Sequence, residues 1–472
     1  MTDQTLAMKF QSGRTVMAAL GMLTAALGAG CMLIPAYQRP IAPVASQFPG
    51  AASPTAASPV VSAAGLSWRA VFADERLQAL IDLALVTNRD LRIATLNVEQ
   101  SHAQYRLSRA SLLPAIEGNG GYSAQYTEGL TTRQWDVSLG TSAYILDFFG
   151  KTRSLNTEAF EQFLATEEAR RSAWIALVAE VATQYSNWRE AEAQLALANQ
   201  TLIAVEDSLQ LNKVRFEAGE ANELDLRSAE GEVQTAQINV HAYERQLGQA
   251  RNALELLLGA PIPSSLPAPR PFEASQQTTA IPAGMPSDLL EHRPDILQAE
   301  HALRAANANI GAARADFFPS ITLTGLAGKA SPQLSGLFAT GSAAWNFAPQ
   351  ITLPLFDAGA NRASLDVART QARIDVAQYE KAIQTAFREV ADALVANSSY
   401  AQEIDTETAA IEIQRRRLFL ATLRYRQGED SYLNVLSAQQ DLYGAQQGLL
   451  SAQYNRIASQ ISLYQALGGG WQ

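Results

Sequence analysis

Cysteine, histidine and the common catalytic motifs are scarce or absent in this chain of 472 residues. The single cysteine, Cys31, can form neither an intramolecular disulfide framework nor a metal cluster that needs several thiolates. The four histidines are scattered along the chain: His102, His241, His292 and His301. The sequence contains no HExxH, GxSxG, P-loop or dinucleotide-binding motif. We therefore expect no enzyme activity, no metal site and no cofactor.

Charged residues are also sparse. They make up 17% of the chain, the formal net charge is −10 and the pI is about 5.1. Nucleic-acid-binding proteins normally carry a basic patch, so this composition argues against nucleic acid as a partner. After Cys31 no stretch is apolar enough for a transmembrane helix. If the mature chain crosses a membrane, it must do so with β-strands.

The first 30 residues have the pattern of a signal peptide. Lys9 and Arg14 precede an apolar run, residues 16–30, that is too short to span a membrane and ends in small residues. Cys31 follows directly, as in bacterial lipoproteins, although "GAGC" matches their Leu-Ala-Gly-Cys pattern imperfectly. We expect Cys31 to carry the lipid and, because no aspartate follows it, the protein to be sorted to the outer membrane. The alternatives are a secretory signal with an incidental cysteine, and translation that starts at Met8 instead of Met1.

Two tandem halves repeat one sequence pattern. Residues 88–116 align with residues 293–321, and residues 146–154 align with residues 355–364, at nearly constant offsets. Pro-rich stretches precede and separate the halves. The expected segments are a signal peptide at 1–30, an extended tether at 31–66, a first repeat at 67–258, a Pro-rich connector at 259–286, a second repeat at 287–467 and a tail at 468–472.

Each half contains a moderate helix that ends at a proline (Pro114, Pro319), and then two segments with alternating polarity. These segments predict two strands per half, each about the 9–11 residues that a tilted membrane strand needs. Residues expected on one side of a strand are Trp135, Val137, Leu139, Thr141, Ala143 and Ile145 in the first half, and Ile321, Leu323, Trp345, Phe347, Ile351 and Leu353 in the second. Pro349 weakens the last strand. The alternative is a pair of soluble hairpins packed on a helical domain.

A very long helix follows the strands in each half. Residues 151–217 contain neither proline nor glycine, so this helix would extend about 100 Å. Its large apolar residues are spaced as in a coiled-coil seam: Trp174, Val178, Val181, Tyr185 and Trp188. Such a helix requires antiparallel neighbours of similar length. Four membrane strands are too few to close a barrel, because bacterial barrels begin at about eight, so at least two copies must associate.

One short motif occurs once in each half. It reads "RFEAGEANELDLRSA" at residues 215–229 and "RYRQGEDSYLNVLSA" at residues 424–438. In both copies the long helix reaches its first glycine there, Gly219 or Gly428, and the chain turns back. Both motifs are therefore predicted to be tips of helical hairpins.

The block "RPDILQAEHALRAANANIGAARADFFPSITLTG", the turn "LFDAGANR" and the doubled tip motif resemble the TolC-type outer membrane efflux proteins, within them the NodT/OprM-like lipoprotein branch. The resemblance extends from about Cys31 to Gly468. It implies a homotrimer in which four strands per chain form one 12-stranded barrel, continued by an α-helical periplasmic tunnel. The implied function is a passive exit duct in the outer membrane of a Gram-negative bacterium. The implied partners are a periplasmic adaptor, an inner-membrane pump and outer membrane lipid.

In this family the hairpin tips form a constricted gate and dock the adaptor. The residues that would contribute here are Arg215, Glu220, Asp225, Tyr425, Glu429, Asp430, Asn434 and Ser437. Asp225 occupies the acidic position of the first tip, but the second tip has Asn434 and Ser437 where relatives commonly carry aspartate. The alternative is that these are solvated charges at helix ends. Two other functions stay open: the exit duct of a type I protein secretion system, and a structural coiled-coil envelope lipoprotein.

Overall fold

The computed structural model describes residues 32–45, 48, 67–272, 289–290 and 292–470. The expected signal peptide, Cys31, and parts of the expected tether, connector and tail lie outside these residues. The chain divides into two compact units. Unit 1 comprises Met1–Ile41, Asn97–Glu167 and Gln298–Glu380, and unit 2 comprises Ala42–Leu96, Glu168–Leu297 and Lys381–Gln472.

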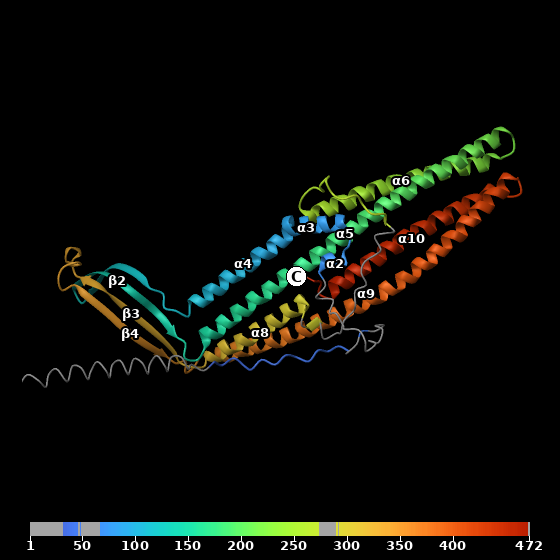
Figure 1. The fold of residues 1–472 in the computed structure, drawn as a ribbon. Coiled ribbons are helices and arrows are strands. Elements are labelled where there is room, and N and C mark those ends of the chain that lie inside the picture. The colour runs from blue at the N-terminus through green and yellow to red at the C-terminus, as the bar shows by residue number, and fades with distance from the viewer. Residues whose placement is uncertain (1–31, 46–47, 49–66, 273–288, 291, 471–472) are drawn as a thin grey trace, which may run out of the picture. The chain divides into compact units, whose positions relative to one another are not determined.

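Both halves of the sequence fold into a helix, two strands and a long helical hairpin (Figure 1). The first half contains α2 (Trp68–Val71), α3 (Glu75–Thr87), α4 (Arg89–Ala110), β1 (Glu117–Thr127), β2 (Leu130–Leu146), α5 (Lys151–Glu217) and α6 (Glu223–Leu258). The second contains α8 (Pro294–Ala315), β3 (Ser320–Ser331), the short 3₁₀ helix η3 (Leu334–Gly336), β4 (Ala343–Thr352), α9 (Ala360–Arg426) and α10 (Tyr432–Ala466). None of the helices within the described ranges combines the length and the apolar character needed to cross a membrane.

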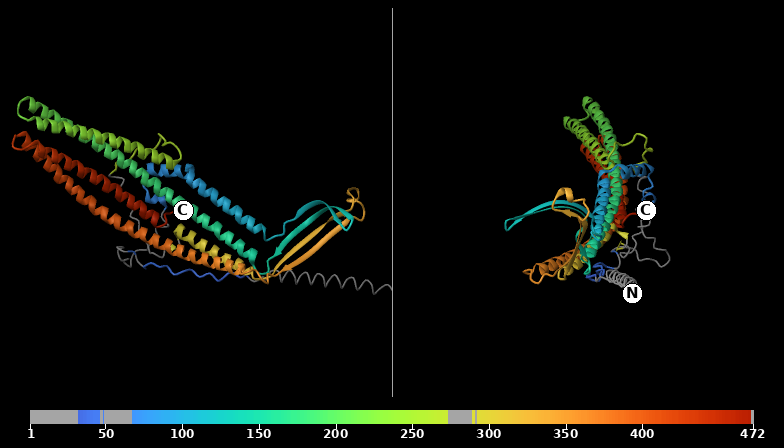
Figure 2. Two further views of the ribbon diagram at one scale, coloured as in Figure 1. Left: turned by 180° about the vertical axis from the view of Figure 1, so that it is seen from behind. Right: turned by 90° about the vertical axis from the view of Figure 1, so that its left-hand side faces the viewer.

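The four strands form one antiparallel sheet in unit 1, in the order β1-β2-β3-β4, and the right-hand view of Figure 2 shows that it is curved. Residues directly opposite each other in the register point to the same face. One face collects the large apolar side chains: Tyr122, Trp135, Val137, Leu139, Leu323, Trp345, Phe347 and Ile351. The other collects polar side chains: Asn119, Ser123, Gln134, Asp136, Ser138, Thr322, Asn346 and Gln350. The sheet therefore has one mainly apolar face, which also carries Arg133 and Lys329, and one mainly polar face, which also carries Leu326.

The side expected for Ile145 is wrong because β2 contains a bulge. Ala143 adopts a positive φ of 56° in the bulge. Beyond it Tyr144 pairs with Leu323, whereas Ile145 pairs with Thr322 and so belongs to the polar face. An extra residue in a strand reverses the alternation that follows it, and this cannot be read from polarity alone. In the second half, the expected Leu353 lies just beyond the end of β4.

The two longest helices begin and run in the same way. The predicted continuous helix over residues 151–217 is confirmed as α5, and α9 has the same length of 67 residues. An aspartate precedes each: Asp147 accepts a hydrogen bond from the backbone of Thr152 (3.1 Å), and Asp357 accepts one from the backbone of Asn361 (2.8 Å). A carboxylate a few residues before a helix can accept hydrogen bonds from the N–H groups of the first turn, which have no partner within the helix. The predicted seam residues of α5 pack in the core of unit 2.

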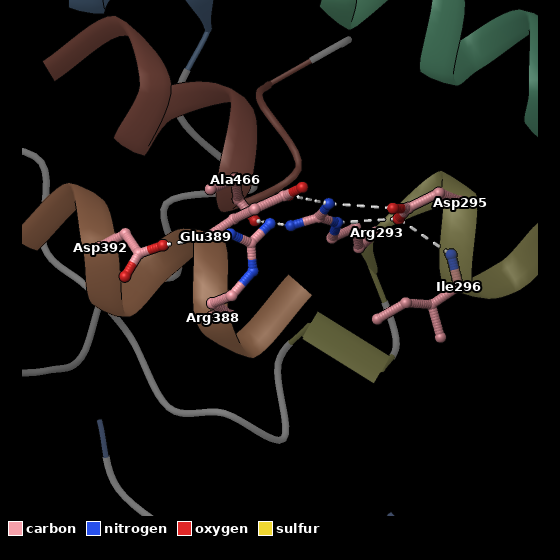
Figure 3. A network of polar contacts seen from close by, with 7 residues as sticks. All are labelled: Arg293, Asp295, Ile296, Arg388, Glu389, Asp392 and Ala466. Atoms are coloured by element: carbon pink, nitrogen blue, oxygen red, sulfur yellow. Dashed lines mark hydrogen bonds and ion pairs between the residues drawn. The ribbon is translucent and has the colours of Figure 1, made fainter. Parts of the chain in front are cut away.

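In unit 2, each half fixes the end of its last helix with the side chain of the residue that directly precedes α4 or α8. Asn88 donates to the carbonyl oxygen of Leu257 near the end of α6 (2.8 Å). At the equivalent place Arg293 donates to the carbonyl oxygen of Ala466 at the end of α10 (2.8 Å). Figure 3 shows that the Arg293 guanidinium also binds two carboxylates, those of Asp295 (2.8 and 2.9 Å) and Glu389. The same backbone contact is thus made by a neutral amide in one half and by an ion-pair network in the other.

The described part of the expected tether, residues 32–45, contains no helix or strand. Within unit 1, its residues 33–39 are held against α8. The carbonyl oxygens of Leu33 and Pro35 accept hydrogen bonds from Arg314 (3.0 Å) and Asn307 (2.8 Å). Ile34 lies so close to Gly311 that a Cβ added there would be 2.6 Å from its Cγ1. We call residues 33–39 the strap, because they are bound along the helix.

A buried carboxylate fixes the next part of the strap. Tyr37 (3.2 Å) and Arg39 (3.1 Å) both donate to Glu300, whose side chain is 3% exposed, and Arg304 donates to it from within α8 (2.7 Å). Burial alone would raise the pKa of Glu300, but the hydrogen bonds and charges of the two arginines lower it below its usual value. Glu300 is therefore held ionised, with one of its two cations supplied by the strap.

Candidate functional site at the hairpin tips

Both tip motifs form the same backbone turn, and both lie in unit 2, where Figure 2 shows the two tips side by side. In the first tip the N–H of Glu220 donates to Arg215 O (2.8 Å), and Gly219 has a φ of 77°. In the second the N–H of Glu429 donates to Arg424 O (3.0 Å), and Gly428 has a φ of 75°. The N–H of each glycine makes a second bond, to the carbonyl oxygen three residues earlier (3.0 Å in both tips). The two bonds together form a Schellman ending, which needs a residue in the left-handed conformation that glycine adopts without strain.

The return helices also begin alike. The side chain of Asn222 accepts a hydrogen bond from the N–H of Asp225 (2.8 Å) at the start of α6. Ser431 accepts one from the N–H of Leu433 (3.2 Å) at the start of α10. These N-caps satisfy free donors of the first turn and fix where each return helix starts. The backbone of the two tips is therefore duplicated as closely as the sequence motif suggests.

The side chains connect the two hairpins through Arg215 and Tyr425. Arg215 of α5 donates to the backbone carbonyl of Tyr425 on α9 (2.6 Å), and its guanidinium lies 4.5 Å from the centre of the Tyr425 ring. The Tyr425 hydroxyl donates to the side-chain oxygen of Asn212, one turn before Arg215. Tyr425 is buried and packs on Tyr432 with 5.3 Å between ring centres. We call Asn212, Arg215 and Tyr425 the tip latch, because they join the first hairpin to the second.

Electrostatics at the latch keep Tyr425 neutral. Burial raises its pKa, and the nearby Asp225 carboxylate raises it further, against the lowering effect of Arg215. The tyrosine therefore keeps its proton and acts as a hydrogen-bond donor at every physiological pH. Desolvation raises the pKa of Tyr432 in the same way, to about 12.

A second polar group occupies the tip of the second hairpin alone. Asp430 accepts hydrogen bonds from the N–H of Ser431 (2.9 Å) and from the side chain of Asn434, and it lies 3.4 Å from Arg424. The backbone bond from Ser431 is the main cause of its lowered pKa, followed by the bond from Asn434. We call Arg424, Asp430 and Asn434 the tip cluster.

The remaining predicted gate residues lie around these two groups. Glu220 is exposed, with its carboxylate 3.8 Å from Arg215, and Asp225 is half-buried. Glu429 is exposed. Ser437 accepts a hydrogen bond from Arg417 of α9 (3.2 Å). Arg215 and Tyr425 thus belong to the tip latch and Asp430 and Asn434 to the tip cluster, whereas Ser437 belongs to neither group. The role of the predicted residues in a gate stays a prediction.

Several residues of the tips escaped the sequence prediction. They are Asn212 in the latch, Tyr432 packed behind it, and the ion pair between Arg417 and Asp441 that connects α9 with α10. Asn212 could have been found, because it precedes Arg215 by three residues and so shares its helix face. The pairing of Arg417 with Asp441 could not have been found in this way, because the two residues lie on different helices. Which residues of α9 and α10 lie opposite each other depends on the geometry of the turn between them.

Comparison with known proteins agrees with this architecture. The family model "Outer membrane efflux protein" matches residues 80–260 and 285–469. The toluene efflux pump outer membrane protein TtgC of Pseudomonas putida is 46% identical over 95% of this chain and 94% of its own length. The cation efflux system protein CusC of Escherichia coli is 42% identical over 94% of this chain and 96% of its own length.

Solved structures show the same fold. The open state of the MtrE outer membrane channel of Neisseria gonorrhoeae superimposes with a TM-score of 0.86 and 40% identity, covering 94% of this chain and 99% of the channel chain. A CusC structure superimposes with a TM-score of 0.84 and 41% identity, covering 93% of this chain and all of its own. The chain therefore belongs to the outer membrane efflux protein family.

Proposed function

We propose that three copies of this protein form one channel through the outer membrane. The observation that carries this proposal is the two-faced sheet: apolar residues such as Trp345 and Phe347 collect on one face, and polar residues such as Asn346 and Gln350 on the other. Such a sheet suits lipid on one side and water on the other. Its edge strands β1 and β4 would carry unpaired backbone groups in lipid, at high cost, unless copies pair edge to edge. Three copies of four strands would close a 12-stranded barrel.

The long hairpins would continue this barrel as a periplasmic tunnel. Helices α5 and α9 each have 67 residues, which corresponds to about 100 Å of helix. We propose that the tunnel receives its cargo from an inner-membrane pump through a periplasmic adaptor. Relatives of similar identity are named for toluene and for cations, which suggests that the duct itself does not select the cargo.

The tips are the proposed gate. The tip latch holds the end of the first hairpin against the second, so separating the hairpins would require breaking the bonds between Arg215, Asn212 and Tyr425. Asp225 and Glu220 beside it would provide acidic groups around the mouth, as in other charge-lined pores. Acylation at Cys31 would add a lipid anchor to a protein that the strands already hold in the membrane.

Conductance in planar lipid bilayers tests the proposed function. The purified protein should give discrete channels, and cross-linking should trap trimers. Asp225→Asn should weaken block by divalent cations, whereas Glu206→Gln, a charge removal at an exposed position on α5, should not. A structural coiled-coil lipoprotein would give no conductance at all, and that result would overturn the proposal.

A further inference from the structure

A cavity of about 550 Å³ opens in unit 2 between helices of the two hairpins. Leu197 of α5 and Ile411 of α9 are buried in its wall, and buried Phe272, which follows α6, closes one side. α10 contributes the remaining wall. The volume falls within the range of about 300–1,000 Å³ typical of small-molecule sites, which are mostly apolar with a few polar groups that fix orientation.

One polar group in this cavity lacks a partner. Gln453 of α10 lines the cavity and is 6% exposed, and its side-chain oxygen accepts no hydrogen bond from the described residues. A buried acceptor without a donor is costly, so most such groups in proteins are satisfied. A molecule in the cavity that offers an N–H or O–H group would remove this cost.

The charges around the cavity are balanced locally. Arg189 pairs with Glu192 on α5, and Arg415 pairs with Glu412 on α9. The cavity therefore offers two positive and two negative side chains that already neutralise each other. A charged ligand would find no free counter-ion and would lose its hydration on entry, so the lining favours an uncharged molecule.

We propose that this cavity is a binding site for a neutral, largely apolar small molecule with one hydrogen-bond donor, which Gln453 accepts. The cavity is built from both halves, α5 from the first hairpin and α9 and α10 from the second. A bound molecule stabilises the arrangement of the hairpins that forms the cavity, because it binds that arrangement and no other. This inference does not depend on the proposed gate.

Indole and 1-methylindole are matched probes for this site, since only indole carries an N–H donor. Titration calorimetry with the full-length protein in detergent should show saturable binding of indole. The affinity for 1-methylindole should be about three- to tenfold lower, which corresponds to one net hydrogen bond. Gln453→Met keeps the length of the side chain but removes the acceptor, so it should bring the two affinities together.

A blocking variant separates this cavity from uptake of indole elsewhere. Ala196 lies at the mouth of the cavity and is exposed, so Ala196→Trp should close the cavity without straining the core and should abolish binding. Ala204→Trp, also exposed on α5, is the matched control and should bind as the wild type does. The proposal is overturned if the wild type shows no saturable binding, if it binds both probes equally, or if Ala196→Trp still binds indole.

Discussion

Arg215 and Arg424 occupy the same position in the two tip motifs, yet they act differently. The Arg215 side chain is 13% exposed and reaches across to the other hairpin, whereas the Arg424 side chain is 57% exposed and stays with Asp430 of its own hairpin. The backbone turns around them are alike. The same contrast holds where Asn88 and Arg293 make the same backbone contact with different chemistry. The main-chain hydrogen bonds of the turns are therefore the same in the two halves, whereas side chains at equivalent positions bind different partners.

The largest difference between the halves is expected at the helix ends. Arg293→Ala leaves Asp295 and Glu389 without their cation and Ala466 without its donor, at a cost of about 3 kcal/mol. Asn88→Ala removes a neutral donor to Leu257 and also the side-chain acceptor of the Leu91 N–H (2.8 Å) at the start of α4, so it should cost about 1–2 kcal/mol. Native-state hydrogen exchange at the ends of α10 and α6 measures the two effects separately. Equal acceleration in the two variants would contradict the view that the second contact is the stronger.

The tip latch gives the next largest effect. Arg215→Gln removes the charge that joins the hairpins, and we expect a loss of about 1–2 kcal/mol because this side chain is largely buried. Arg424→Gln breaks an exposed ion pair and should cost less than about 0.5 kcal/mol.

Spin labels measure this difference as a distance between the tips. Labels at Ala218→Cys and Gln427→Cys, in the Cys31→Ser background, report the separation of two equivalent exposed positions. Arg215→Gln should broaden the distance distribution and Arg424→Gln should leave it unchanged. Broadening by both variants, or by neither, would show that Arg215 is not the residue that joins the hairpins.

Glycine replacements should act equally on the two tips. Gly219→Ala and Gly428→Ala each force alanine into a left-handed conformation, although there is space for the added methyl group. We expect each to cost about 1 kcal/mol, seen as faster exchange of the Glu220 and Glu429 amides. Gly231→Ala, in the interior of α6 with equal space, is the control and should instead stabilise by about 0.5–1 kcal/mol. A marked difference between the two tips would mean that their turns are less alike than they look.

The smallest expected difference between the two tips is in how fast their amides exchange at acidic pH. The pKa of Asp430 is lowered in the folded state, so its contribution is complete above the ordinary aspartate pKa of about 4 and is lost as the pH falls through the lower folded value. The first tip has Ala221 at this position and so lacks this sensitivity. Below about pH 4, amide exchange at Leu433 should accelerate more than at Asp225. Asp430→Asn should remove that difference, and its persistence in the variant would assign it to another group.

The sequence predicted main-chain features better than side-chain partners. The absence of proline and glycine over residues 151–217 and the glycines that end the long helices defined the hairpins, because local rules govern helix ends. Alternating polarity likewise predicted four strands, although the bulge moved Ile145 to the other face. The latch joins Asn212 and Arg215 to Tyr425, more than 200 residues away, and no local pattern encodes such a pairing.

The strap has a binding site on only one of the two repeats. It is held by Glu300, Asn307 and Gly311 of α8, but the equivalent positions of α4 are Thr95, His102 and Arg106. Thr95 cannot balance the charge of Arg39, and Arg106 would fill the space that Gly311 leaves for Ile34. If the two halves were exchanged in the gene, the strap would be joined directly to the half that contains α8. It would still bind α8 and would find no equivalent site on α4. The strap is thus specific for the repeat that stands second in the chain.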